Sequence, residues 1–345
     1  MKDIKVLGID LAKNVFQLHG INAKGKCVLK KRLSREKLIE FMAQLPPCLV
    51  GMEACGGGHY WARMFIGMGH TVKMMAPQFV KPYVKSNKND ANDAEGICEA
   101  VTRPNMKFVP VKKIEQQDVL LSHRARELVI KQRTAQANQI RGLLAEYGIV
   151  IALGISHIRK MTEILENNKL KLTVKSEAIF IRLYEQFKVY DEQVKIYDKE
   201  IQCQADTDPM CIEVQKIEGI GSLTASAIVA SIGDASVFNN GREVSAWLGL
   251  VPKQHSSGNN VRLGGISKRG DRYLRTLLIH GARSALTRCE DKEDKKNKWM
   301  ADVKQRCGFN KAAVALANKN ARTIWALMAH GECYRASDIQ ESVAA

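Results

Sequence analysis

The first 110 residues alternate between short apolar runs of strand length and longer amphipathic stretches of helical periodicity. The pattern predicts strands at 4–10, 14–20, 26–32, 48–53 and 70–76, and helices at 34–44, 58–69 and 90–102. The first three strands are separated by short turns, which predicts a meander. The later alternation of strand and helix predicts an α/β domain whose sheet continues largely in parallel.

From residue 114 the chain changes to long helical patterns. One charged helix is predicted over 114–147 and a second over 176–203. The second helix has apolar residues spaced alternately three and four apart, namely Phe180, Leu183, Phe187, Tyr190, Val194, Tyr197 and Ile201. This heptad seam is typical of a coiled coil. It predicts packing either against the first helix of the same chain or against the same helix of another chain.

The segment 217–234 places Gly219 and Gly221 immediately before a helix of small residues, a pattern typical of a helix-hairpin-helix. Glycines in such a turn let backbone N–H groups approach a phosphate at the start of a helix. A tight turn between two helices without any ligand has the same pattern. The sequence leaves both interpretations open.

Residues 251–275 hold four glycines and six Lys or Arg against one acid, Asp271. This composition predicts a flexible basic loop that can follow a phosphate backbone. The cations expected to bind nucleic acid are Lys253, Arg262, Lys268, Arg269 and Arg272. Helices are predicted over 273–288 and 311–328, and the charge run at 291–298 predicts a solvated turn between them.

Charge and cysteine content narrow the class of protein. The 345 residues include 53 Lys and Arg against 36 Asp and Glu, a formal net charge of +17. Such an excess favours a polyanionic partner, most often nucleic acid. No apolar run is long enough to span a membrane, and we expect no signal peptide. Nine scattered cysteines without a Cys-x-x-Cys pair argue against a zinc ribbon and indicate reduced thiols in a cytoplasm.

Four carboxylates fall where a strand ends or a helix begins. Asp10 and Glu53 each end an apolar strand, and Asp90 and Asp93 share a face in the first turn of a predicted helix. Acids in a first helical turn also suit the helix dipole. Taken together, however, four such carboxylates are a common way to hold two metal ions for phosphoryl transfer. We therefore expect Mg²⁺, with Mn²⁺ able to substitute.

Five ordered motifs connect these features. They are Gly8-Ile9-Asp10-Leu11-Ala12-Lys13, Met52-Glu53-Ala54-Cys55-Gly56-Gly57, Lys88-Asn89-Asp90-Ala91-Asn92-Asp93-Ala94, Gly219-Ile220-Gly221, and Gly249-Leu250-Val251-Pro252 through Ser257-Gly258. In these motifs the chain resembles the DEDD transposases of a family of bacterial insertion sequences. Members of that family are bridge-RNA-guided recombinases with a RuvC-like N-terminal domain and a serine-bearing C-terminal domain. Many have Thr where Asn89 stands, a position that is not an acidic ligand.

The resemblance implies metal-binding catalytic roles for Asp10, Glu53, Asp90 and Asp93. It also implies a serine nucleophile in the segment 256–258. Ser257 is preferred because the family's serine precedes a glycine, and Ser256 is the alternative. The implied partners are donor DNA, target DNA and an element-encoded noncoding RNA that pairs with both. A dimer or tetramer of the chain, acting at the nucleoid in a bacterial cytoplasm, is implied as well.

The predicted organisation has four parts. Residues 1–110 form a RuvC-like, RNase H-like α/β domain, 111–205 a helical coiled-coil region, 206–335 a mostly α transposase domain with a helix-hairpin-helix and the serine loop, and 336–345 a flexible tail. Two other functions fit parts of this pattern. A RuvC-like junction endonuclease would use a metal-activated water and would not need Ser257. A nucleic-acid-binding protein without catalysis would need neither the serine nor Asp10. A sugar-kinase or actin-like fold also opens with Gly-x-Asp, but a phosphate-binding glycine loop is missing from the sequence.

Overall fold

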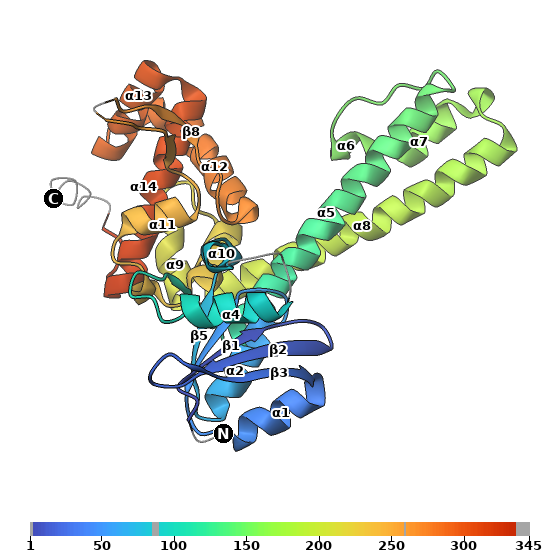
Figure 1. Cartoon of the computed structure of the whole chain (residues 1–345). Coiled ribbons are helices and arrows are strands. Elements are labelled where there is room, and N and C mark those ends of the chain that lie inside the picture. The colour runs from blue at the N-terminus through green and yellow to red at the C-terminus, as the bar shows by residue number, and fades with distance from the viewer. Residues whose placement is uncertain (1–2, 85–89, 259, 336–345) are drawn as a thin grey trace. The chain divides into compact units, whose positions relative to one another are not determined.

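The structure is a computed structural model that describes residues 3–84, 90–258 and 260–335, without the side chain of Asp90. The predicted tail at 336–345 therefore lies outside the described residues. The chain divides into two compact units, Met1–Ile114 and Glu115–Ala345. Figure 1 shows the first unit in blue to cyan and the second in green to red. None of the described helices is long and apolar enough to cross a membrane.

The first unit is built on a six-stranded sheet in the order β3-β2-β1-β4-β5-β6. The strands are β1 (Val6–Asp10), β2 (Val15–Ile21), β3 (Cys27–Ser34), β4 (Leu49–Glu53), β5 (Thr71–Met75) and β6 (Phe108–Val109). β1 to β3 pair antiparallel, whereas β1, β4 and β5 run parallel, so the predicted meander and its parallel continuation are confirmed. The antiparallel edge strand β6 was not predicted, because two residues are too short to show a period.

Helices cover both faces of this sheet. They are α1 (Arg35–Gln44), α2 (Gly58–Gly67), α3 (Pro77–Val80), the 3₁₀ turn η1 (Lys81–Tyr83) and α4 (Asp90–Ala100). On one face, Leu7 and Ile9 of β1 are fully buried in a core that includes Trp61 of α2, and the Trp61 ring meets Phe16 edge-on at 5.0 Å. On the other face, Val6 packs on the cluster that holds Ile97 of α4.

A glycine on β1 lets α4 lie directly on the sheet. A Cβ built at Gly8 would lie 2.3 Å from the carbonyl oxygen of Ala94 and 2.5 Å from the backbone nitrogen of Cys98. Real Cβ atoms do not approach that closely, so only glycine fits this position. Gly51, the neighbour of Gly8 on β4, meets Val101 in the same way, at 2.8 Å.

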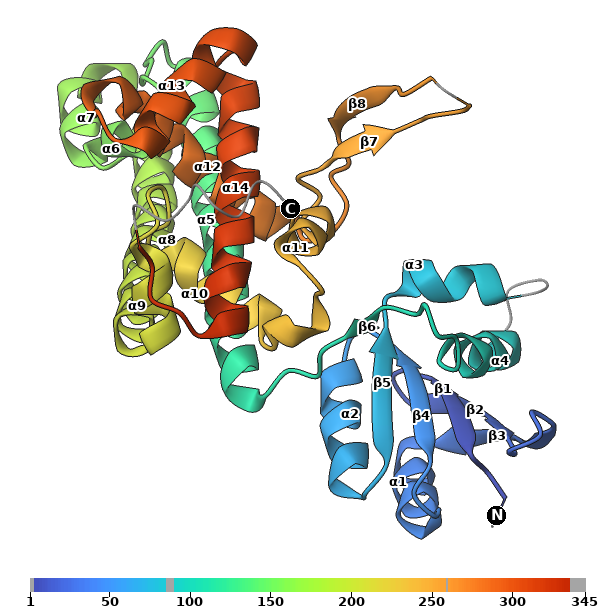
Figure 2. The same ribbon diagram turned by 90° about the vertical axis from the view of Figure 1, so that its left-hand side faces the viewer.

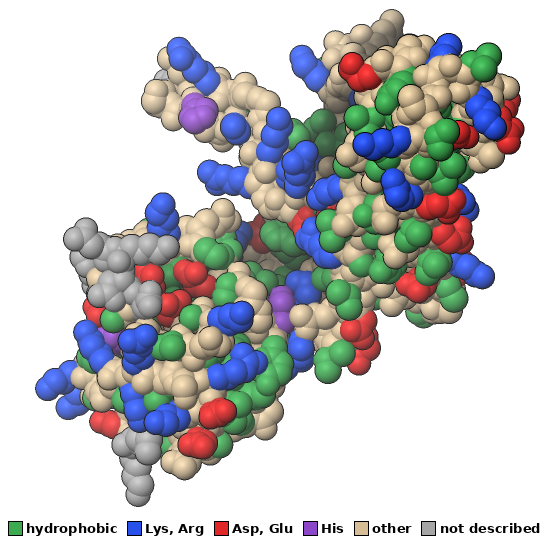
Figure 3. All heavy atoms as spheres, turned by 90° about the vertical axis from the view of Figure 1, so that its right-hand side faces the viewer, with side chains coloured by type: hydrophobic (Ala, Val, Ile, Leu, Met, Phe, Trp, Pro, Cys, Tyr) green, Lys and Arg blue, Asp and Glu red, His purple; other side chains and the backbone are tan. Residues whose placement is uncertain are grey.

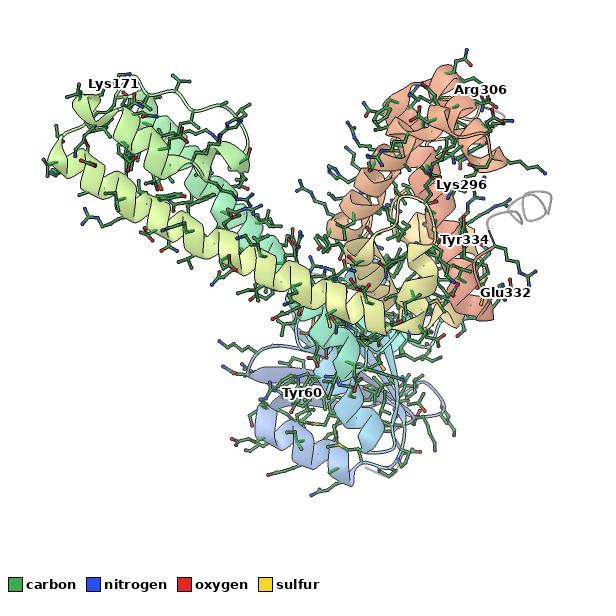
Figure 4. All side chains as sticks on the ribbon, turned by 180° about the vertical axis from the view of Figure 1, so that it is seen from behind. Tyr60, Lys171, Lys296, Arg306, Glu332 and Tyr334 are labelled. Atoms are coloured by element: carbon green, nitrogen blue, oxygen red, sulfur yellow. The ribbon has the colours of Figure 1, made fainter. Side chains whose placement is uncertain are left out.

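The second unit opens with a hairpin of two long helices, α5 (Ile114–Ala145) and α8 (Val174–Thr207). Figures 1 and 4 show the two helices side by side over much of their length. Phe180 and Phe187 of the predicted seam are buried in one cluster with Ile140 and Leu144 of α5. The seam of α8 therefore packs within the chain, and coiled-coil pairing between chains remains a prediction.

An ion-paired carboxylate fixes the outer half of the hairpin. Asp191 of α8 accepts hydrogen bonds from Arg133 of α5 at 2.7 Å and from Arg159 at 2.7 and 2.9 Å. Arg159 follows the short helix α6 (Ile155–Ile158), and α7 (Met161–Asn167) and η2 (Lys169–Lys171) complete the far end, where Lys171 is labelled in Figure 4. The hydrogen bonds from Arg159 and Arg133 hold the pKa of Asp191 below its usual range.

The rest of the second unit is a helical bundle with one small ribbon. Its elements are α9 (Pro209–Gln215), α10 (Ser222–Ile232), η3 (Ala235–Val237), α11 (Gly241–Trp247), β7 (Pro252–Gln254), β8 (Leu263–Ile266), α12 (Arg272–Thr287), η4 (Cys289–Asp291), α13 (Lys295–Cys307) and α14 (Phe309–His330). Ile228, Leu278 and Leu316 are fully buried in their shared core. Figure 2 shows the ribbon β7–β8 standing away from these helices.

Two predictions for this unit were wrong. The charge run at 291–298 is not a solvated turn, because Asp294 caps α13 by accepting from the backbone N–H groups of Lys296 and Asn297. Those two side chains are themselves buried. The segment 251–275 is not a loop throughout, because β7 and β8 pair antiparallel within it. Both errors have one cause: charge and glycine content suggested solvated chain where capping and pairing impose order.

Candidate functional site

Asp10 and Glu53 lie at the ends of neighbouring parallel strands. β1 and β4 pair in the register Val6↔Leu49 through Ile9↔Met52, and the next residue on each strand is a carboxylate. Side chains alternate between the two faces of a sheet. Gly8 and Gly51 face α4, so Asp10 and Glu53, two residues further along, project to the same face. Both are partly buried.

The pKa of the Cys55 thiol is affected by the carboxylates at this strand end. Cys55 follows β4 in the turn that leads to α2, and its backbone N–H donates to the Glu53 carbonyl at 3.0 Å. Partial burial, followed by the negative charges of Glu53 and Asp10, raises the pKa of the Cys55 thiol. The Cys55 thiol is therefore near the strand end that has both carboxylates.

The two other predicted carboxylates belong to α4. Asp93 is partly buried, and the next residue, Ala94, is the one that contacts Gly8. Asp90 is the first residue of α4, but its side chain lies outside the described residues. Within the described part of the chain, no three His, Cys, Asp or Glu side chains are arranged to hold a metal ion. Oxygen donors at the strand ends do suit Mg²⁺, so the structure brings Asp10 and Glu53 together and leaves the four-residue site a prediction.

Ser257 lies near the tip of the ribbon β7–β8. Gln254 pairs with Leu263, the His255 N–H donates to the Arg262 carbonyl at 3.0 Å, and Ser257 bridges Asn260. These pairs share one register without a bulge. Position 259 lies outside the described residues, so Gly258 is the described part of the turn.

The register gives the ribbon two faces of different chemistry. Residues directly opposite each other share a face, and so do residues two apart on one strand. One face, the serine face, has His255, Ser257, Asn260 and Arg262. The other face has Gln254, Ser256, Val261 and Leu263, and the Gln254 amide donates to the Ser256 hydroxyl at 3.0 Å. Val261 and Leu263 are 68% and 64% exposed, so the β8 side of this second face is apolar and uncovered within the second unit.

The root of the ribbon is held firmly although its tip is exposed. Arg275 of α12 is nine-tenths buried and donates from Nη1 to the carbonyl of Leu248 at 3.1 Å and to that of Arg269 at 3.0 Å. These carbonyls belong to the two chain segments that enter and leave the ribbon. A Cβ at Gly270 would lie 1.9 Å from the Trp247 carbonyl oxygen, so the segments cross in direct backbone contact.

All five predicted nucleic-acid-binding cations are exposed: Lys253, Arg262, Lys268, Arg269 and Arg272. In Figure 3 the projecting ribbon has Lys and Arg side chains in blue and a histidine in purple. The glycine turn is more ambiguous. Gly219 packs against Gly281 of α12, which by itself explains the glycine, whereas Gly221 caps α10 and has open space beside its Cα. Phosphate binding by this turn remains a prediction.

A buried histidine that the sequence did not single out ties α5 to the bundle. His123 of α5 is 1% exposed, and its ring nitrogens lie 2.9 Å from the Tyr273 hydroxyl and 3.0 Å from the Ser226 hydroxyl. Burial lowers the pKa of His123 to about 4, and Arg126 and Arg124 contribute. Tyr273 lies in the first turn of α12, three residues after the ribbon root. A single histidine inside a helical pattern has no spacing that could reveal such a role.

An α/β unit with carboxylates at adjacent strand ends, in one chain with a basic ribbon, suits an enzyme that processes DNA. Comparisons with known proteins agree. The family described as "Transposase IS116/IS110/IS902 family" matches residues 211–298, and the DEDD transposase family of IS110 elements matches residues 7–149. The chain belongs to this IS110/IS116 family of insertion-sequence transposases.

Several relatives match over nearly their whole length. A "Probable family 20 transposase" of Pseudomonas aeruginosa PAO1 is 47% identical, over 95% of this chain and 98% of the relative. The "Transposase for insertion sequence element IS1111A" of Coxiella burnetii RSA 493 is 48% identical, over 97% of this chain and 92% of the relative. The corresponding protein of IS1328 from Yersinia enterocolitica is 38% identical, over 97% and 99%.

Proposed function

We propose that this transposase exchanges DNA strands through a covalent phosphoserine at Ser257, assisted by Mg²⁺ bound to Asp10, Glu53, Asp90 and Asp93. The proposal is supported by the presence of two features in one chain. These are the carboxylates at adjacent strand ends, and a serine on an exposed basic ribbon whose root is fixed by hydrogen bonds. Metal-bound carboxylates alone support hydrolysis. A serine nucleophile is what strand exchange without ATP adds.

In the proposed step, the Ser257 Oγ attacks the scissile phosphorus. The Oγ–P bond forms while one P–O bond of the DNA backbone breaks, so the energy of the phosphodiester is kept in the protein–DNA link. The serine proton leaves to a base, and the departing DNA oxygen takes up a proton. Asp10, Glu53, Asp90 and Asp93 would hold Mg²⁺, which when bound would supply positive charge to stabilise the displacement. A hydroxyl of the second DNA then attacks the phosphorus of the phosphoserine. The new O–P bond forms while the Oγ–P bond breaks, the attacking hydroxyl loses its proton, and the Ser257 oxygen takes up a proton.

The two faces of the ribbon favour Ser257 over Ser256. Ser257 shares its face with Arg262 and His255, polar groups suited to a phosphate, whereas Ser256 shares its face with Val261 and Leu263. A charged phosphate is poorly placed against exposed apolar side chains. We therefore expect Ser257→Ala to abolish the covalent protein–DNA adduct and Ser256→Ala, its matched control one residue away, to leave it.

The guide RNA and the oligomeric state belong to the same proposal. The net charge of +17 suits a partner of RNA as well as DNA. RNA guidance would place sequence choice in base pairing and leave the protein to recognise backbone and shape. A structured noncoding segment beside the gene, with loops that match the element ends and the target, is the observation that tests it.

A RuvC-like junction endonuclease is the alternative function. It uses the carboxylates and a water nucleophile, so it predicts undiminished DNA cleavage by Ser257→Ala and no protein–DNA adduct in any variant. The recombinase proposal predicts that Asp10→Asn and Ser257→Ala each abolish cleavage. Denaturing gels of end-labelled DNA show the adduct and the cleavage product in one experiment. DNA binding alone does not separate the two functions, because it weakens with salt in both.

A further inference from the structure

The five exposed cations of the second unit do not share one position relative to Ser257. Lys268, Arg269 and Arg272 lie at the root of the ribbon or on α12. Lys253 lies on β7 at the register irregularity between Pro252 and Gln254, whereas Arg262 lies in the regularly paired part of the ribbon nearer the tip. The ribbon register puts Arg262 directly opposite His255, and Ser257 directly opposite Asn260. These two pairs are successive on the serine face, about 6.6 Å apart along the strand.

We propose that Arg262 is a catalytic residue that binds the non-bridging oxygens of the scissile phosphodiester beside Ser257. This inference rests on the proposed function, since it assigns the partner of the serine in the same reaction. The chemical class of the ligand is a phosphodiester anion, held at one position on the ribbon and not along its length.

The surroundings of Arg262 leave its guanidinium available. The Arg262 side chain is exposed. Arg124, in contrast, is engaged with Asp271 at 2.8 Å, and Arg275 is engaged with two carbonyls. A guanidinium can bind two phosphate oxygens through parallel hydrogen bonds, which fixes orientation as well as charge. The ribbon register puts Arg262 and Ser257 on one face.

Charge development explains why such a group would act on the rate. When Ser257 attacks, the negative charge on the non-bridging oxygens increases before the leaving oxygen departs. A cation fixed beside those oxygens stabilises the transition state more than the ground state. A cation at the ribbon root attracts DNA in both states equally and affects binding alone.

The experiment measures formation of the Ser257–DNA adduct in a single turnover, with the full chain, its guide RNA and saturating protein. We expect Arg262→Ala to slow adduct formation by roughly 10²- to 10³-fold, the effect of removing one stabilising group at an oxyanion. Arg262→Lys retains the charge but not the paired hydrogen bonds and should recover part of the rate. Arg182→Ala removes one exposed arginine of α8 that is outside the predicted nucleic-acid-binding residues, and it should leave the saturated rate unchanged.

A neutral phosphate gives a readout that a structural role of Arg262 cannot produce. A methylphosphonate at the scissile position lacks the charge that Arg262 would bind, so wild type and Arg262→Ala should form the adduct at similar rates on it. An undiminished saturated rate for Arg262→Ala on ordinary DNA overturns the inference while the Ser257 adduct stands. Equal slowing on both substrates also overturns it, since it shows a general defect. Absence of any adduct in the wild type overturns the proposed function itself.

Discussion

Arg275→Met removes the guanidinium that joins the two chain segments at the root of the ribbon β7–β8. Methionine keeps much of the buried stem but cannot donate to the carbonyls of Leu248 and Arg269, which the arginine contacts at 3.1 and 3.0 Å. The side chain is nine-tenths buried, so water replaces these donors poorly. We expect the root to open more often while the helical core keeps its packing.

The magnitude follows from the two lost bonds. A hydrogen bond from a charged group contributes about 1.5 kcal/mol at the low end of the usual range, so two contribute about 3 kcal/mol. Because about 1.4 kcal/mol corresponds to a factor of ten, local opening of the root should increase by roughly 10²-fold. Covalent adduct formation should also fall, because an unfixed ribbon presents Ser257 in many orientations.

Amide hydrogen exchange measures this opening directly. The N–H groups of Ser267 and Lys268 donate to the carbonyls of Val251 at 2.8 Å and Gly249 at 3.2 Å, across the root. Their protection should fall by roughly 10²-fold in Arg275→Met while that of α14 is unchanged. Arg272→Met, an exposed arginine on the same helix, is the control. Unchanged protection at Ser267 and Lys268 in a folded Arg275→Met protein would refute the role of Arg275 in holding the root closed.

Two further predictions concern the two units separately. Gly8→Ala should destabilise the first unit by about 1–3 kcal/mol or more and abolish DNA cleavage, since its methyl overlaps backbone atoms of α4 at 2.3 and 2.5 Å. Gly56→Ala, with open space at its Cα, should do neither in urea unfolding and cleavage assays. His123 has its pKa lowered from 6.5 to about 4, so the unfolded chain binds a proton that the folded unit does not. Acidification from pH 7 to 5 should therefore cost about 2 kcal/mol of stability, and His123→Gln should remove that share of the pH dependence; an equal pH slope in both proteins would contradict it.

The first unit could be predicted well because its signals are local. Continuous apolar runs end at Asp10 and Glu53. Because side chains of a strand alternate between the two faces of a sheet, both carboxylates fall on one face once the strands are known to be parallel neighbours in register. What the pattern could not show is the height of α4 above the sheet. That distance depends on Gly8 meeting Ala94, two positions more than 80 residues apart in the chain.

The prediction for the ribbon was wrong although the sequence contains a local hairpin signal, because composition was given more weight. A Gly-Asn pair, as at 258–259, is a two-residue hairpin signal. High glycine and charge content nevertheless favoured a flexible loop over 251–275. The order of the root comes from Arg275 and from the crossing at Gly270, which are tertiary contacts. Similarly, α13 owes its inward face to Met300 and Val303, which the preceding charge run concealed.

The construction of the root bears on the choice between recombinase and nuclease. Burying the charge of Arg275 costs several kcal/mol, which its hydrogen bonds to Leu248 and Arg269 offset only in one geometry. A loop that binds DNA only through its charge does not need a fixed orientation, because electrostatic attraction to phosphates does not depend on which face of the loop is presented. Displacement at phosphorus does depend on it, because the nucleophile must approach in line with the leaving oxygen. A fixed root below an exposed, two-faced tip therefore favours chemistry at Ser257 over DNA binding by the ribbon alone.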